Sequence, residues 1–132
     1  MADFFEKNKD DLKGKEGVYF FAQNSYGNGV GILLGKMDNE DLAIAMNLAI
    51  EKLTRVMLGD PFNATSFPTQ NYSEKKYGGC IVNSLIKVTS SGLSPEYEHM
   101  FGVEVLRNRG FLGDAEYHNI QKEFETYKNH GK

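Results

Sequence analysis

The segment from Asp38 to Leu58 constrains this chain more than any other part of the sequence. Asp38 is a favourable N-cap and Gly59 a favourable stop, so the segment is predicted to form one helix. Most of its residues are apolar. Some form one stripe at helical spacing, and others lie outside that stripe. The stripe comprises Leu42, Ala45, Met46, Ala49, Leu53, Val56 and Met57, and the other apolar residues are Ile44, Leu48 and Ile50. Such a helix must be covered on more than one side. One small sheet covers a single side, so we expect a homo-oligomer held together through the 38–58 helix.

The remaining sequence predicts a small, mostly antiparallel sheet. Two apolar strands, 18–23 and 30–35, flank a segment rich in Asn and Gly, which is typical of a β-hairpin. A further strand is expected over 80–89. Segment 96–109 is ambiguous: its β-branched residues and glycine favour a strand, but a helix stays open.

A second, amphipathic helix is predicted at the C-terminus. Asp114 caps it, and its apolar stripe consists of Tyr117, Ile120, Phe124 and Tyr127. Residues 1–16 are expected to form an arm or a short helix, and 59–79 a long loop. The chain is therefore predicted to be a single α+β domain over 1–132, with a sheet packed by the central apolar helix and the C-terminal helix.

Composition narrows the possible functions. The 132 residues suit one domain. Eighteen acidic against 15 basic residues give a net charge of −3, which argues against binding to duplex nucleic acid. No apolar run approaches the length of a membrane span, and the first residues lack a signal-peptide pattern. The single cysteine, Cys80, fits a reducing compartment, so we expect a cytoplasmic protein.

A search for catalytic motifs yields none. The cluster Gly27-x-Gly29-x-Gly31 lacks the spacing of a dinucleotide fingerprint or a P-loop. The histidines lack zinc-ligand spacing, and no cofactor is indicated. We therefore expect no enzymatic activity, no catalytic residue and no metal site. His99 and Cys80 are the only side chains we retain for a small enzyme, as a third alternative.

Candidate ligand contacts come from two places in the sequence. The hairpin tip offers exposed amides and a tyrosine ring, and glycines on one face of a strand allow close approach by a helix, a subunit or a ligand. On a strand, Arg107 and Arg109 would point the same way, and their two guanidinium groups could both donate hydrogen bonds to one phosphate. The alternatives are a tight, closely packed turn and a solvent-exposed arginine pair with salt bridges. The predicted ligand-binding residues are Ser25, Tyr26, Gly27, Asn28, Gly29, Tyr77, Phe101, Arg107 and Arg109.

The hairpin over 25–31, the following apolar helix and the pair Arg107 and Arg109 resemble phage-encoded sponge proteins of the Thoeris anti-defence type. This resemblance implies a non-enzymatic homo-oligomer in the host cytoplasm. Its interface pockets would sequester a cyclic ADP-ribose isomer or a cyclic oligonucleotide. It also implies backbone contacts at 27–31 and phosphate contacts at the arginines. The alternative is a small acidic inhibitor, an immunity or anti-defence protein, that binds and masks a protein partner with a basic surface.

Overall fold

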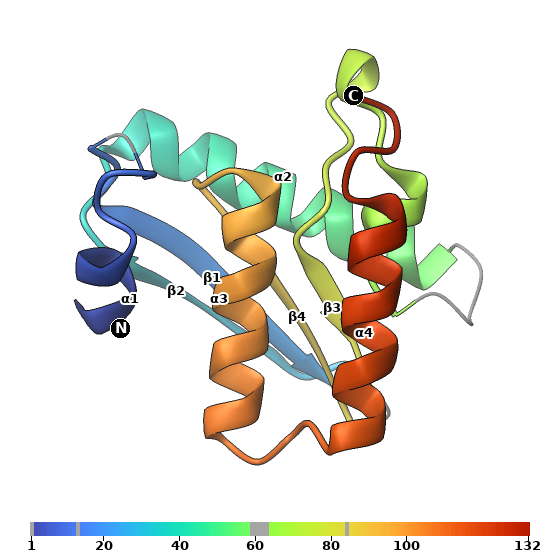
Figure 1. Cartoon of the computed structure of the whole chain (residues 1–132). Coiled ribbons are helices and arrows are strands. Elements are labelled where there is room, and N and C mark those ends of the chain that lie inside the picture. The colour runs from blue at the N-terminus through green and yellow to red at the C-terminus, as the bar shows by residue number, and fades with distance from the viewer. Residues whose placement is uncertain (1, 13, 59–63, 84) are drawn as a thin grey trace.

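The computed structural model describes residues 2–12, 14–58, 64–83 and 85–132. It shows an α+β fold with one four-stranded antiparallel sheet of order β2-β1-β4-β3, which confirms the predicted fold class (Figure 1). The elements are α1 (Ala2–Lys7), β1 (Gly17–Asn24), β2 (Gly29–Gly35), α2 (Asn39–Leu58), the 3-10 helices η1 (Phe67–Thr69) and η2 (Tyr72–Glu74), β3 (Cys80–Val82), β4 (Ile86–Ser91), α3 (Pro95–Asn108) and α4 (Asp114–Tyr127).

Helices cover the two faces of the sheet unequally (Figure 1). Alternate residues of β1 point to opposite faces, as the pleat requires. Val18 belongs to a core cluster with Phe101 of α3, whereas Tyr19 packs against Ala45 and Ala49 of α2. The sheet therefore lies between α2 on one face and α3 with α4 on the other. None of the helices in the described ranges is long and apolar enough to cross a membrane.

The segment 96–109 is helical, so the strand favoured from its β-branched residues is wrong. Pro95 opens α3, where its fixed backbone angle suits a first turn. Gly102 faces the sheet, and a Cβ there would lie 3.0 Å from the Ile81 side chain. The glycine thus allows α3 to approach β3 closely. The single strand predicted over 80–89 is instead two paired strands, β3 and β4.

Helix α2 is buried on one side only. Ala45, Ala49 and Leu53 are buried against the sheet, but on the outer side Ile44 is 53% exposed and Ile50 47% exposed. Met46, which belongs to the predicted apolar stripe, is also exposed. The rest of the described chain does not cover the outer side of this helix.

Candidate functional site

A cavity of about 580 Å³ opens at the end of the sheet where β1 begins and β4 ends. Its volume lies in the range of small-molecule pockets. Five separate stretches of chain, around residues 14–17, 36–38, 41–52, 77 and 91–98, contribute to its wall. The apolar part of the lining includes Met37, Ile44, Leu48 and Leu93.

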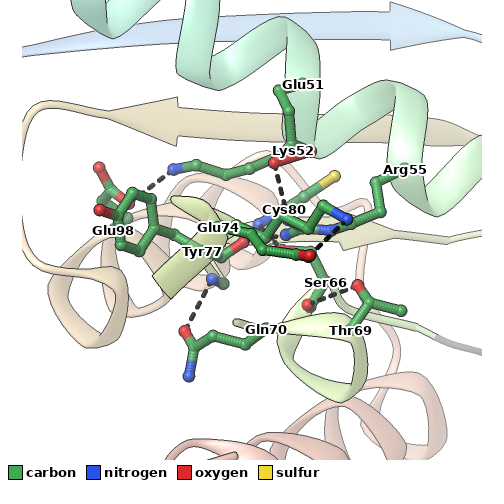
Figure 2. Close-up of polar contacts among 12 residues, drawn as sticks. Glu51, Lys52, Arg55, Ser66, Thr69, Gln70, Glu74, Tyr77, Cys80 and Glu98 are labelled. Carbon is green, nitrogen blue, oxygen red and sulfur yellow. Dashed lines mark hydrogen bonds and ion pairs between the residues drawn. The ribbon is translucent and has the colours of Figure 1, made fainter. Parts of the chain in front are cut away.

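A buried ion pair stands at the inner wall of this cavity. Lys52 of α2 donates from Nζ to Glu98 Oε1 of α3 at 2.7 Å (Figure 2). The same Nζ also donates to the Ser90 carbonyl at 2.5 Å. The second carboxylate oxygen of Glu98 accepts from the Leu93 N–H at 3.2 Å. Burial raises the pKa of Glu98, and the nearby Lys52 ammonium opposes that shift. The pair joins α2, β4 and α3, with both side chains almost fully enclosed.

The strip Tyr77–Cys80 passes directly over this ion pair. A Cβ at Gly79 would lie 2.9 Å from Glu98 Oε1, and the φ of Gly79 is +108°. A Cβ at Gly78 would lie 2.3 Å from the Phe67 ring. Only glycines allow the chain to pass between the ion pair and that ring. Arg55 of α2 donates to the Tyr77 carbonyl and thereby ties the strip to the helix (Figure 2).

The mouth of the cavity carries both signs of charge. Lys15 and Lys36 contribute positive charge, and Glu16, Asp38 and Asp41 contribute negative charge. As predicted for an N-cap, the Asp38 side chain accepts from a backbone N–H in the first turn of α2, that of Asp41, at 2.8 Å. The cavity therefore offers a bound molecule apolar surface, hydrogen-bonding groups and charges of both signs.

The predicted hairpin tip is at the other end of the sheet from the cavity. The side chain of Asn24 accepts from the N–H groups of Tyr26 and Asn28, which fixes the turn. Gly27 has a φ of +86°, and Tyr26 is 89% exposed. Ser25 is exposed in the same turn. The structure thus brings these residues together but places them away from the cavity.

The glycines of β2 accommodate aromatic rings of the neighbouring strand. A Cβ at Gly31 would lie 1.9 Å from the Tyr19 hydroxyl, and a Cβ at Gly29 2.6 Å from the Phe21 ring. The close approach expected on this face is therefore made by residues of β1. The space beside Gly29 on this side is occupied by the protein itself.

The arginines do not form a fork. Arg107 lies on a helix, with its guanidinium 4.1 Å from the centre of the Tyr117 ring and 3.7 Å from Asp114 Oδ1. Arg109 is the C-cap that follows the last residue of α3, Asn108, so the strand on which both arginines would point the same way is absent. Phe101 is buried between Phe4 and Phe20. Of the predicted binding residues, Tyr77 alone lines the cavity.

His99 and Cys80 are buried and lie outside the cavity lining. The His99 ring stacks on Phe124 at 4.1 Å, and its Nε2 is 2.6 Å from Gln121 Oε1. Burial lowers the pKa of His99 to about 4 and raises that of Cys80 to about 12. At neutral pH the imidazole is uncharged and the thiol protonated. Within the described ranges, no group of acidic, His and Cys side chains is arranged to hold a metal ion.

Sequence reasoning missed Lys52 and Glu98, although the sequence carries a signal for the first. Lys52 lies three residues after Ala49 and four before Val56, on the side of α2 that faces the sheet. A charged residue on the buried side of a helix requires a partner. Glu98 gives no comparable signal, because the ambiguous segment left its direction undefined.

No protein-family model matches the chain, and no curated protein or solved structure matches it significantly either, so the resemblance to phage sponge proteins gains no support from these comparisons.

Proposed function

We propose that the protein binds a small molecule in the cavity between α2 and the start of α3, without turning it over. The observation that carries this proposal is the cavity wall built around the Lys52–Glu98 pair. Lys52 donates to two acceptors, and both oxygens of Glu98 accept hydrogen bonds. Groups that are bonded to each other and to the backbone in this way hold a shape, and they do not stand ready as a general acid or base.

The cost of burying this pair supports a role in shaping the cavity. Replacing a buried ion pair by apolar residues of similar volume is often neutral or stabilising. Stability alone therefore does not explain Lys52 and Glu98. Their hydrogen bonds fix the separation of α2 and α3, and that separation sets the width of the cavity. A defined width favours one ligand over others of similar chemistry.

The ligand class we propose is a nucleotide derivative, as the resemblance implies. Lys15 and Lys36 supply cations for a phosphate, and the Tyr77 ring supplies a surface for a base. Three acidic side chains share the mouth with these two lysines. That balance opposes a ligand with many phosphates, so a cyclic ADP-ribose isomer fits better than a larger cyclic oligonucleotide.

A second candidate function follows from the outer side of α2. Met46 and Ile50 form one exposed apolar patch, and Ile44, on the opposite flank of the helix, is half exposed and also lines the cavity. A second copy packed there would form a homo-oligomer and complete the cavity at a subunit interface. If a different protein packs there, the chain is instead an acidic inhibitor of that protein.

Calorimetry with a panel of nucleosides, cyclic nucleotides and ADP-ribose derivatives tests the main proposal. We expect heat of binding from one class, with the ligand recovered unchanged. Leu48→Trp fills the cavity and should weaken binding at least about tenfold. Asn47→Trp, on the exposed side of the same helix turn, is the matched control and should bind normally.

Two results would overturn the proposal. If the folded protein gives no heat of binding with any member of the panel, the proposal of a nucleotide ligand is contradicted. Conversion of a bound ligand into a product would show an enzyme instead of a binding protein.

A further inference from the structure

The two edges of the sheet differ in how they are protected. At the β3 edge, the Ser66 N–H donates to the Cys80 carbonyl and the Val82 N–H donates to the Ala64 carbonyl. Thr65 also bridges to Ile81, so the preceding chain covers this edge. At the other edge, β2 pairs with β1 on one side only. No other part of the described chain pairs with its outer side.

The ladder between β1 and β2 shows which backbone groups of β2 are unpaired. The Asn24 N–H donates to the Asn28 carbonyl at 2.9 Å, and the Lys36 N–H donates to the Glu16 carbonyl at 3.0 Å. Antiparallel pairs exchange hydrogen bonds at every second residue. Between these two ends, residues 30, 32 and 34 therefore bond to β1. The N–H and C=O groups of Gly29, Gly31 and Leu33 point outward, and by the same alternation so do those of Gly35 at the end of the strand.

This edge lacks the devices that usually prevent strand pairing. Natural edge strands carry charged residues, proline or a β-bulge. The sequence of β2, Gly29–Gly35, contains no charged residue and no proline. Its register with β1 is continuous over the whole strand, without a bulge. Val30 is 63% exposed and Ile32 46% exposed, so the face beside the edge is apolar as well.

We propose that β2 pairs antiparallel with β2 of a second copy of this chain, which joins the two sheets into one. The alternation requires outward residues of one copy to lie opposite outward residues of the other, and the exposed side chains of Val30 and Ile32 select one register among those that satisfy it. With the two-fold axis at Gly31, Gly31 lies opposite its own counterpart and Gly29 opposite the second copy's Leu33. Gly29, Gly31 and Leu33 of each chain are then hydrogen-bonded.

The same register matches the side chains. Val30 lies opposite the second copy's Ile32, at a pair without backbone hydrogen bonds, where side chains approach most closely. Cross-strand pairs of β-branched residues are favourable in sheets. The exposed apolar residues of both chains thus form one continuous strip across the joint. A strand of this sequence complements itself, and this favours a second copy over an unrelated partner.

The pairing closes at two copies. Each chain offers one free sheet edge in its described part, because the β3 edge is covered, so a two-fold pair leaves no free edge for a third copy. The residues that follow β2, 36–38, line the cavity. Antiparallel pairing places the two cavities at opposite ends of the joined sheet. The two cavities are then separate from each other. The pairing therefore goes beyond the proposed function and does not depend on ligand binding.

Sedimentation velocity across a wide range of protein concentration tests the pairing. We expect a monomer–dimer equilibrium for the parent chain. Leu33→Pro removes an outward N–H and places the proline ring in the joint, while leaving the ladder to β1 intact. It should weaken dimerisation at least about tenfold. Leu33→Ala, which removes the side chain but keeps the N–H, is the matched control and should still dimerise.

A charge pair tests the register. Val30→Lys and Ile32→Glu should each weaken the dimer. The double variant should restore it, because each introduced ammonium would then face the carboxylate introduced in the other copy. Both sites are exposed, so folding of these variants does not depend on the joint. A parent chain that stays monomeric at all concentrations overturns the proposal. So does a dimer that survives Leu33→Pro and the single charge variants but is lost in Ile50→Glu, which would place the contact on α2.

Discussion

The two halves of the sheet differ in which residues they expose to solvent. In the half formed by β4 and β3, helices lie on both faces, and the charged pair Lys52–Glu98 and the polar His99 are buried. In the half formed by β2, apolar residues such as Val30 and Ile32 are exposed. The usual sorting of polar and apolar residues is thus reversed at both places.

This difference between the covered and the open half of the sheet indicates that the two halves have different roles. Lys52 and Glu98 of the covered half are hydrogen-bonded to each other and to the backbone, so they hold neighbouring elements at fixed distances around the cavity. No described part of the chain packs against the exposed apolar edge of the other half. This edge gains free energy only when another surface covers it. We therefore propose that the covered half serves ligand binding within the chain and that the open half serves contact between chains.

The largest effect is expected where the buried charges are uncoupled. Lys52→Met leaves the Glu98 carboxylate buried without its partner and should lower the free energy of unfolding by about 3–5 kcal/mol. The double variant Lys52→Met/Glu98→Met should recover most of that loss, since no charge then remains buried. Urea denaturation of both variants measures it. A double variant as unstable as Lys52→Met would show that the pair matters only through packing.

The buried histidine should make the covered half sensitive to acid. The pKa of His99 is lowered from 6.5 to about 4 in the folded chain, so between these values the unfolded chain binds a proton that the folded chain excludes. The free energy of unfolding should then fall by about 3 kcal/mol as pH drops from 6.5 to 4.

Urea denaturation at several pH values measures this loss against two variants. His99→Phe, which keeps the ring stacked on Phe124, should lose this part of the pH dependence. His118→Gln, at an exposed position of α4, is the control and should keep it. Equal pH dependence in His99→Phe and the parent would contradict a buried, uncharged histidine.

The close passage of the 77–80 strip should be less costly to disturb. In Gly78→Ala the new Cβ meets the buried Phe67 ring, and we expect a loss of about 1–3 kcal/mol. Gly113→Ala is the matched control, because nothing lies within 4 Å of its Cβ position. Thermal unfolding compares the two. A Gly78→Ala variant as stable as Gly113→Ala would mean that the strip moves freely.

The smallest effect on the folded chain is expected in the open half. Val30→Thr changes an exposed side chain and should alter the stability of the monomer by no more than about 0.5 kcal/mol, measured at high dilution. Val88→Thr, at a buried position of β4, places a hydroxyl in the core and should cost about 1–3 kcal/mol. Similar losses in the free energy of unfolding of both variants would contradict the proposed difference between the two halves.

The sequence predicted the elements that carry strong local signals. The helix at 38–58, the hairpin and the helix from Asp114 all appear in the structure. Segment 96–109 was misread because valines and a glycine outweighed the start signal of Pro95 and the acidic residues after it. Gly102 serves a close contact with β3 there, and local propensity does not reveal such a contact.

The candidate site could not be predicted in the same way. The cavity wall comes from separated stretches, and Lys52 and Glu98 are 46 residues apart in the sequence. Only the fold shows that their side chains meet. The open edge, by contrast, was partly visible: the uncharged, glycine-rich strand 30–35 was recognised, but its position at the edge of the sheet was not.

Native mass spectrometry of the purified protein tests the division between the two halves most directly, because it reports subunit number and retained small molecules together. We predict a dimer that carries one small molecule per chain, and a Leu33→Pro variant that is monomeric but still carries its molecule. Bare single chains of the parent protein, under conditions where it is folded, would contradict the account.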